Sequence, residues 1–193
     1  MKGQRILMEG NVSQRIFFVK EGKIKIYKTD KSGHELILRF AKKGDIIGFG
    51  DLDTVSGQEE SAMAIDETIL CCLDQNVFVQ LVRLYPELAI ELLNFYRNEL
   101  RNSEIKNFKL ARLNVPGKVA DALLTMYEAY GGNGNDHTIN LVLSRQEIAN
   151  LAGTTKEQVS KVLSEFHDQG IIHTKSKQID ILKMESLKAL ARI

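Results

Sequence analysis

The 193-residue sequence contains no long apolar run, although its overall apolar content is ordinary. A membrane-spanning helix needs about 20 consecutive apolar residues, and no segment approaches that length. The start, MKGQRILMEGNVSQRIFF, also lacks the uninterrupted apolar stretch that marks a chain for export. We therefore expect a cytoplasmic protein without a membrane anchor.

Cysteine is scarce, since the chain has only Cys71 and Cys72, which are adjacent. Neighbours on a strand point to opposite faces, so this pair can neither share a metal ion nor form an ordinary disulfide. We expect both to be reduced packing residues, as in cytosolic proteins. The four histidines are scattered without the spacing of a ligand set, so we expect no structural metal site.

Positive charge is absent from one long stretch. Between Gly44 and Val82 the chain has eight acidic residues and no Lys or Arg. Within it, FGDLDTVSGQEESAMA (residues 49–64) alternates glycines and small polar residues as anion-binding loops do, but offers an anion no fixed cation. The whole chain is close to neutral, at a formal net charge of +1. Any contact with DNA must therefore come from local placement of basic residues.

From Arg5 to about Leu73 the sequence reads as short alternating runs broken by glycine-containing turns. In KIKIYK, Ile24, Ile26 and, less regularly, Tyr27 alternate with lysines, which predicts a half-buried strand. TDKSGHE predicts a hairpin turn in which Gly33 adopts a positive φ. Several such strands at regular spacing indicate a sandwich or jelly roll.

The period becomes helical from Asp74, and Pro86 lies where a first-turn proline belongs. No Gly or Pro follows before Pro116, which predicts a helix of roughly 25 residues. A heptad frame places a narrow seam on this helix. The seam residues are Leu93, Tyr96, Leu100, Ser103, Asn107 and Leu110. We expect a contact between two chains here, because a long exposed helix is rarely stable alone. The alternative is a helix packed on its own β-domain.

The C-terminal part predicts a helix-turn-helix. VPGKVADALLTMYEAYG is an amphipathic helix, and TINLVL reads as a short strand that ends at Ser144. Ser144 and Glu147 form a capping box for a helix that ends at Gly153. Thr154 or Thr155 then caps a second helix that buries an apolar stripe. The stripe consists of Val159, Val162, Leu163 and Phe166. After Gly170, IIHTKS and KQIDIL predict a two-stranded basic wing.

With these motifs in place, the chain resembles transcription regulators of the CRP/FNR family over nearly its whole length. KGQRILMEGNVSQRIFFVKEGKIKIYK is similar to the family's early strands, and LSRQEIANLAGTTKEQVSKVLSEFHDQGII to its DNA-binding signature. The resemblance implies an α+β fold with three parts. These are a cyclic-nucleotide-binding-like jelly roll (1–85), a long dimerisation helix (86–113) and a winged helix-turn-helix (114–193). The family usually has a short helix and a first strand ahead of Met1, which suggests a truncated start.

The resemblance also assigns residues to DNA. The family's base-reading positions fall on Glu157, Ser160 and Lys161, where the FNR branch typically has Glu-x-x-Ser-Arg. Lysine reaches guanine without the rigid fork of arginine. The remaining expected contacts are phosphate contacts, from Arg145, Thr155, Lys156, Lys175 and Lys177. The implied partners are double-stranded DNA, a second copy of the chain and RNA polymerase.

The acidic loop occupies the place of the family's phosphate-binding cassette. The Gly-Glu pair for ribose becomes Gly50-Asp51, and the Arg-Ser pair for phosphate becomes Glu60-Ser61. A carboxylate at Glu60 repels phosphate where arginine would attract it, so we expect no cyclic AMP. Ser103 falls near the hydroxyls that contact nucleotide in cyclic AMP members, with Glu104 beside it.

Three possibilities stay open for the effector. They are a different effector, a regulator without one, and a haem or redox sensor that uses Cys71, Cys72 or a histidine. We expect no iron–sulfur cluster, because the family's N-terminal cysteine cluster is missing. No catalytic motif is present, so an enzyme is not expected. A cyclic-nucleotide-binding module without a DNA role is the other alternative, although residues 144–182 argue against it.

Overall fold

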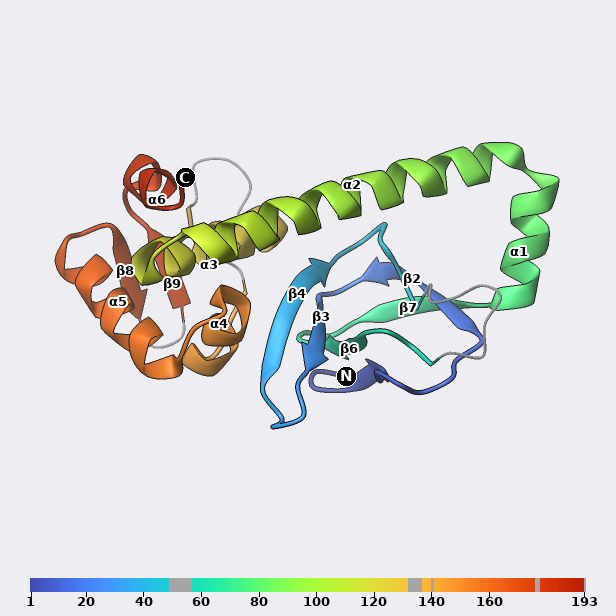
Figure 1. The fold of residues 1–193 in the computed structure, drawn as a ribbon, viewed down its shortest axis with the longest axis horizontal. Coiled ribbons are helices and arrows are strands. Elements are labelled where there is room, and N and C mark those ends of the chain that lie inside the picture. Colours follow the sequence, from blue (N-terminus) through green and yellow to red (C-terminus); the bar gives the residue numbers. More distant parts are fainter. Residues whose placement is uncertain (49–56, 132–136, 140, 176–177, 193) are drawn as a thin grey trace. The chain divides into compact units, whose positions relative to one another are not determined.

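The computed structural model describes the whole chain except residues 49–56, 132–136, 140, 176–177 and 193. It divides into two compact units, Met1–Ser103 and Glu104–Ile193, which we describe separately. Strands dominate the first unit and helices the second, which confirms the α+β class (Figure 1). The predicted domain limits near residues 85 and 113 stay predictions. Among the described residues, no helix combines the length and the apolar character that crossing a membrane requires.

Two antiparallel sheets form the body of the first unit, in the orders β1-β6-β3-β4 and β5-β2-β7. Their strands are β1 (Arg5–Leu7), β2 (Arg15–Glu21), β3 (Ile24–Thr29), β4 (Glu35–Ala41), β5 (Ile46–Ile47), β6 (Ser61–Ala64) and β7 (Ile69–Asp74). One buried cluster takes side chains from both sheets, among them Leu7, Val19, Ile26, Ile47 and Ala62. This arrangement confirms the predicted jelly roll. The β3–β4 hairpin turns at Gly33, whose φ of 86° is the positive value expected.

Strand β3 differs from the half-buried strand that the sequence predicted. Its first four residues are all buried, including Lys25 at 4% exposure. The cause is position, because β3 lies between β6 and β4 and is flanked on both sides. The Lys25 ammonium is 2.7 Å from the Glu35 carboxylate and 4.8 Å from the centre of the Tyr27 ring. The irregular alternation at Tyr27 coincides with a register shift between Ile26 and Tyr27.

The prediction that Cys71 and Cys72 are packing residues is wrong, because both are free and exposed. They lie on β7, the last strand of the sheet β5-β2-β7. Within the described part of the chain, β7 has a hydrogen-bonded neighbour on one side only, and β2 is that neighbour.

Two helices follow the sheets, α1 (Gln75–Leu84) and α2 (Pro86–Arg112). Asp74 caps α1 by accepting a hydrogen bond from the Asn76 N–H at 2.8 Å. Pro86 opens α2 as expected, and the helix runs 27 residues without interruption. Leu92 on α2 joins Phe78 on α1 and Ile16 on β2 in a second buried cluster. The N-terminal turns of α2 therefore pack on the unit's own sheet.

The second unit is built from α3 (Val115–Tyr130), α4 (Arg145–Ala152), α5 (Lys156–Asp168), α6 (Met184–Leu190) and the hairpin β8 (Ile172–Lys175) with β9 (Gln178–Ile181). This order is the predicted winged helix-turn-helix followed by α6, which the sequence did not reveal. Helix α6 approaches α3 closely, since a Cβ on Gly117 would lie 2.9 Å from the Leu190 carbonyl oxygen. Only glycine leaves room for that approach.

The strand predicted in TINLVL is wrong in extent. Among the described residues of this segment, only Thr138 and Ile139 make β-type pairings, each as an isolated bridge. The Ile139 N–H also donates to the Ile179 carbonyl oxygen of β9 at 3.0 Å. Leu141 and Leu143 are buried and Val142 is exposed without strand pairing, so the alternating pattern reflects burial and not a strand.

Candidate nucleic-acid interface and effector site

The turn between α4 and α5 is fixed by local hydrogen bonds. The Ser144 hydroxyl accepts from the Glu147 N–H at 3.2 Å, and the Glu147 carboxylate accepts from the Ser144 N–H at 2.8 Å, which confirms the capping box. Gly153 ends α4 in the left-handed conformation, at φ 60° and ψ 46°. Of the two candidate caps for α5, Thr155 is the one used, and it accepts from the Gln158 N–H at 3.3 Å.

Helix α5 has one buried and one exposed face. Val159, Val162, Leu163 and Phe166 are buried as predicted. Glu157, Ser160 and Lys161 are all exposed on the same helix. The Ser160 hydroxyl donates to the Lys156 carbonyl oxygen at 2.9 Å, which leaves its lone pairs as acceptors. Lys161 lies 4.0 Å from Glu165, a loose pair between largely exposed side chains.

The expected phosphate contacts lie around this helix. Thr155 and Lys156 are exposed at its N-terminal end, and Lys175 is exposed at the end of β8. Arg145, at the start of α4, is half-buried, and its desolvation lowers the pKa of the guanidinium from its usual value. Lys177 lies outside the described residues. A contact that the sequence did not reveal joins α5 to the wing, where the Thr174 N–H donates to His167 Nδ1 at 3.4 Å.

Three of the five residues of the predicted effector site can be described. Gly50 and Asp51 lie outside the described residues, whereas Glu60 and Ser61 lie at the start of β6. Ser61 is 5% exposed, and its hydroxyl oxygen accepts from the Glu9 N–H at 3.0 Å. This contact fixes the position of the hydroxyl oxygen but does not use the hydroxyl proton.

Glu60 shares one guanidinium with a second carboxylate. Arg39 Nη2 on β4 lies 3.8 Å from Glu60 Oε1, and Arg39 Nε lies 2.8 Å from Glu99 Oε2 on α2. The carboxyl on α2 that the structure brings to this cluster is Glu99, one helical turn before Ser103. Ser103 itself is exposed.

The contact of Arg39 with Glu60 could not be seen in the acidic stretch, because Arg39 lies before that stretch in the sequence. The register of the sheet explains the approach: Arg39 pairs with Ile26, and Ile26 pairs with Ala62, the second residue after Glu60. Two strand spacings amount to roughly 10 Å, which an extended arginine side chain can largely span. Only the order of strands β6-β3-β4 could have revealed the contact.

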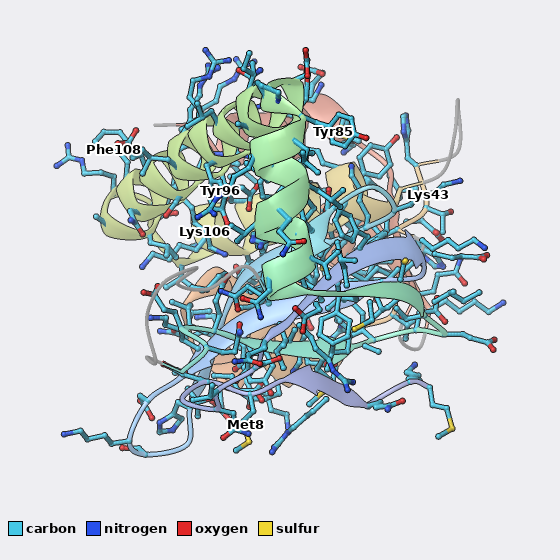
Figure 2. The ribbon with its side chains drawn as sticks, turned by 90° about the vertical axis from the view of Figure 1, so that its right-hand side faces the viewer. Met8, Lys43, Tyr85, Tyr96, Lys106 and Phe108 are labelled. Carbon is cyan, nitrogen blue, oxygen red and sulfur yellow. The ribbon has the colours of Figure 1, made fainter. Side chains whose placement is uncertain are left out.

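The cluster perturbs two ionisable groups. Burial raises the pKa of the Glu60 carboxyl above its ordinary value, Arg39 opposes this, and Glu99 adds to it. Burial also raises the pKa of the Tyr96 phenol to about 12, against the opposing effect of Arg39. Tyr96, labelled on α2 in Figure 2, is therefore both a seam residue and a neighbour of this cluster.

The predicted seam is largely solvent-exposed within one chain. Leu93 is 70% exposed and Leu100 62%, whereas Leu110 is half-buried. Ser103 and Asn107 are exposed. The heptad frame omitted other large apolar side chains of α2 that are also exposed, namely Ile90, Ile105 and Phe108.

Family models match both parts of the chain. The model described as "Cyclic nucleotide-binding domain" matches residues 1–85, and the model described as "Crp-like helix-turn-helix domain" matches residues 117–190. The chain belongs to the CRP/FNR family of transcription regulators.

Relatives of this CRP/FNR regulator include "Electron transport regulator A" of Shewanella oneidensis, which is 28% identical over 98% of this chain and 76% of its own. The "CRP-like cAMP-activated global transcriptional regulator" of Mycobacterium tuberculosis is 28% identical over 99% of this chain and 86% of its own. The solved structure of FixK2 from Bradyrhizobium japonicum is 25% identical, with a TM-score of 0.87 over 100% of this chain and 94% of its own. The two curated relatives are named as regulators, which confirms the expectation that the chain is not an enzyme.

Proposed function

We propose that this CRP/FNR regulator binds an inverted-repeat DNA site as a homodimer in the cytoplasm, with α5 as its recognition helix and without a cyclic nucleotide. The observation that carries the proposal is the division of α5 into two faces. One face is anchored by four buried apolar residues, and the other presents a carboxylate, a hydroxyl and an ammonium to solvent. A helix of this kind, held rigidly and polar on its free face, suits the major groove.

Each exposed group has a complementary base edge. Glu157 accepts from a cytosine amino group, and Lys161 donates to guanine O6 or N7. Ser160 already donates its proton within the helix, so it is best placed to accept from an adenine amino group, or to contact a thymine edge through its methylene. The family resemblance suggests a TTGA-like half-site. Thr155, Lys156, Arg145, Lys175 and Lys177 hold phosphates and position the helix without reading sequence.

A second copy of the chain covers the seam on α2 in this proposal. Full burial of one leucine side chain contributes about 1.5–3 kcal/mol. Leu93 and Leu100 are mostly exposed in the single chain. A two-fold contact buries each of them on both chains, so each leucine contributes its burial free energy twice to the dimer. A two-fold dimer places its recognition helices about 34 Å apart, which gives half-sites one helical turn from centre to centre. RNA polymerase is the partner that a bound regulator of this type would contact.

The contacts of Glu60 and Ser61 support a regulator that does not use cyclic nucleotides. A phosphate at this place would meet the Glu60 carboxylate, and the Arg39 guanidinium beside it already faces two carboxylates. An arginine contact to phosphate contributes about 1.5–3 kcal/mol. Here two carboxylates already offset the positive charge of Arg39, so the guanidinium would attract a phosphate less strongly.

Selection of bound sites from random duplex DNA tests the proposal. Inverted repeats with half-sites one turn apart are expected. Glu157→Ala should lose preference at one base pair per half-site, by about 1–3 kcal/mol. Lys175→Ala, the matched control on the wing, should weaken all sequences alike and lower the slope of log K against log salt by about 1 for each phosphate that the lysine no longer neutralises.

Three outcomes would contradict these proposals. Recovery of unpaired sites, or an unchanged preference in Glu157→Ala, removes α5 from the role of reader. Calorimetry with cyclic AMP and cyclic GMP is expected to show no binding at physiological concentrations. Saturable binding in the low micromolar range would show that the Glu60 site accepts a nucleotide after all.

A further inference from the structure

Two histidines meet where helix α5 faces the wing. His167 is in the last turn of α5, and His173 is on β8. Their ring centroids are 5.4 Å apart, and the ring planes are inclined by 36°. Both side chains are exposed, so water can deliver a proton to either ring. Histidine ordinarily changes its charge between pH 5 and 8, so this contact joins two groups that can become charged together.

The hydrogen bond between the wing and His167 requires a neutral imidazole. The Thr174 N–H donates to His167 Nδ1 at 3.4 Å, so Nδ1 carries no proton and the ring proton is on Nε2. A protonated imidazole has a proton on both ring nitrogens and accepts no hydrogen bond. Protonation of His167 therefore makes Nδ1 a second donor that faces the Thr174 N–H, and the contact between α5 and the wing is lost.

The base of the wing is held independently of His167. Ile172 is fully buried, and the Ile171 N–H donates to the Phe166 carbonyl oxygen at 2.9 Å. Neither contact involves a group that titrates. Loss of the His167 contact therefore releases only the outer part of β8, which ends at Lys175.

The charges around the two rings have both signs. The charged neighbours among the described residues are Glu165 and Asp168 on α5, Lys175 on β8, Asp180 on β9, which lies opposite His173, and Lys183, whose ammonium donates to the Gln169 carbonyl oxygen at 3.0 Å. Helices α3 and α4 also pack on α5, whose buried residues are all apolar. When both rings carry a proton, they repel each other across 5.4 Å.

We propose that His167 is a positioning residue that holds the outer part of the wing against α5, and that protonation of His167 and His173 releases it. Its consequence for DNA rests on the proposed function, in which Lys175 contacts a phosphate. Once the outer part of β8 is released, Lys175 is no longer held in place, and its phosphate contact contributes less to binding. The protonated rings also add positive charge, which strengthens binding to any DNA, so the experiment must separate these two effects.

Nuclear magnetic resonance on the full chain without DNA tests the contact itself. Between pH 8 and pH 5.5, the protection of the Thr174 amide against hydrogen exchange, corrected for the intrinsic rate, should fall about two- to fivefold. The midpoint of this fall should coincide with the titration of the His167 ring signals. A different midpoint, or protection that does not change with pH, would overturn the proposal.

Two variants of His167 serve as matched controls. His167→Asn places a side-chain oxygen near the position of Nδ1, where it accepts a hydrogen bond but does not titrate. His167→Ala removes the acceptor, so the Thr174 amide should have the low protection already at pH 8. In both variants the protection should be independent of pH. A fall in His167→Ala as large as in the unmodified chain would show that His167 is not the group responsible.

The effect on DNA is measured as the loss of affinity that Lys175→Ala causes on one duplex at pH 7.5 and at pH 5.5. Comparing chains with and without Lys175 cancels the charge added by the histidines. The loss should be smaller at pH 5.5 by about twofold or more, and equal at both pH values when His167→Asn is also present. A loss that does not change with pH would overturn the link to DNA. A chain that binds no DNA would contradict the proposed function, and the amide measurement would still decide whether His167 holds the wing.

Discussion

Removal of the shared guanidinium in Arg39→Met should loosen the link between β6 and α2. The 2.8 Å contact between Arg39 Nε and Glu99 is a close ion pair, and a contact of this kind to a charged group contributes about 1.5–3 kcal/mol when desolvated. The Arg39 and Glu99 side chains are 27% and 30% exposed, so solvent screening reduces this to about 1–2 kcal/mol. The variant also leaves Glu60 and Glu99 near each other without the cation between them.

Hydrogen exchange on the full chain measures this effect locally. A loss of about 1–2 kcal/mol corresponds to exchange about 5–30 times faster in peptides that cover β6 and the middle of α2. Peptides from α4 and α5 should be unchanged. Arg5→Met, at an exposed arginine of β1, is the matched control and should have little effect on either set.

Two further measurements can refute the shared-guanidinium explanation: the pH dependence of the Arg39→Met defect, and hydrogen exchange in a double variant. The raised pKa of Glu60 means that its contribution to stability is greatest below the unfolded value of 4.5 and is lost as the pH rises through the folded value. The defect of Arg39→Met should therefore shrink as the pH falls from 7 toward 4.5. The double variant Arg39→Met/Glu99→Gln should exchange more slowly than the product of the two single effects predicts. A defect that is constant with pH, or two fully additive effects, would refute the shared-guanidinium explanation.

Three further outcomes are expected. Leu100→Lys should convert a sedimenting dimer to a monomer at low micromolar concentration, since it puts a charge into the proposed seam, and a dimer that persists would place the interface elsewhere. Gly153→Ala should lower the stability of the second unit by about 1–2 kcal/mol in thermal unfolding, because φ is 60° there, and an unchanged melting temperature would contradict this. Lys106→Met should raise stability at pH 7, because burial lowers the pKa of Lys106 to about 8 and the folded state therefore disfavours the ammonium form. The gain should vanish by pH 10.5, where the lysine is neutral in the unfolded chain as well. A gain that persists at pH 10.5 would contradict this explanation.

The helix-turn-helix could be predicted almost completely because its determinants are local. Ser144 and Glu147 are three residues apart, Gly153 is adjacent to the helix that it ends, and the apolar stripe of α5 repeats with the period of the helix. None of these features requires knowledge of a distant segment. The family resemblance then assigned roles to the exposed residues of α5, and those roles stay predictions.

The errors and omissions involve contacts between distant segments. Lys25 was expected at a solvent-exposed position because alternation does not show that β3 has neighbours on both sides. The cysteines were expected to be reduced packing residues by analogy with cytosolic proteins, an argument that does not show that β7 is the last described strand of its sheet. Arg39 lies 21 residues before Glu60 and on a different strand. The surroundings of Lys25, of the two cysteines and of Arg39 all depend on the order of strands in the sheets, which only the whole fold determines.

The buried pair of Lys25 and Glu35 has a consequence for how β3 and β4 find each other during folding. A slip of two residues between these strands keeps every side chain on its proper face, so the apolar pattern alone tolerates it. Glu35 lies opposite Thr29, so a slip in the direction that takes it farther from Lys25 moves it by about 7 Å along the strand and leaves the Lys25 ammonium buried without its 2.7 Å partner. Breaking a buried pair in this way costs about 3–5 kcal/mol. We infer that the pair adds little net stability to the finished sheet, and that its main effect is to make the misaligned hairpin a short-lived species.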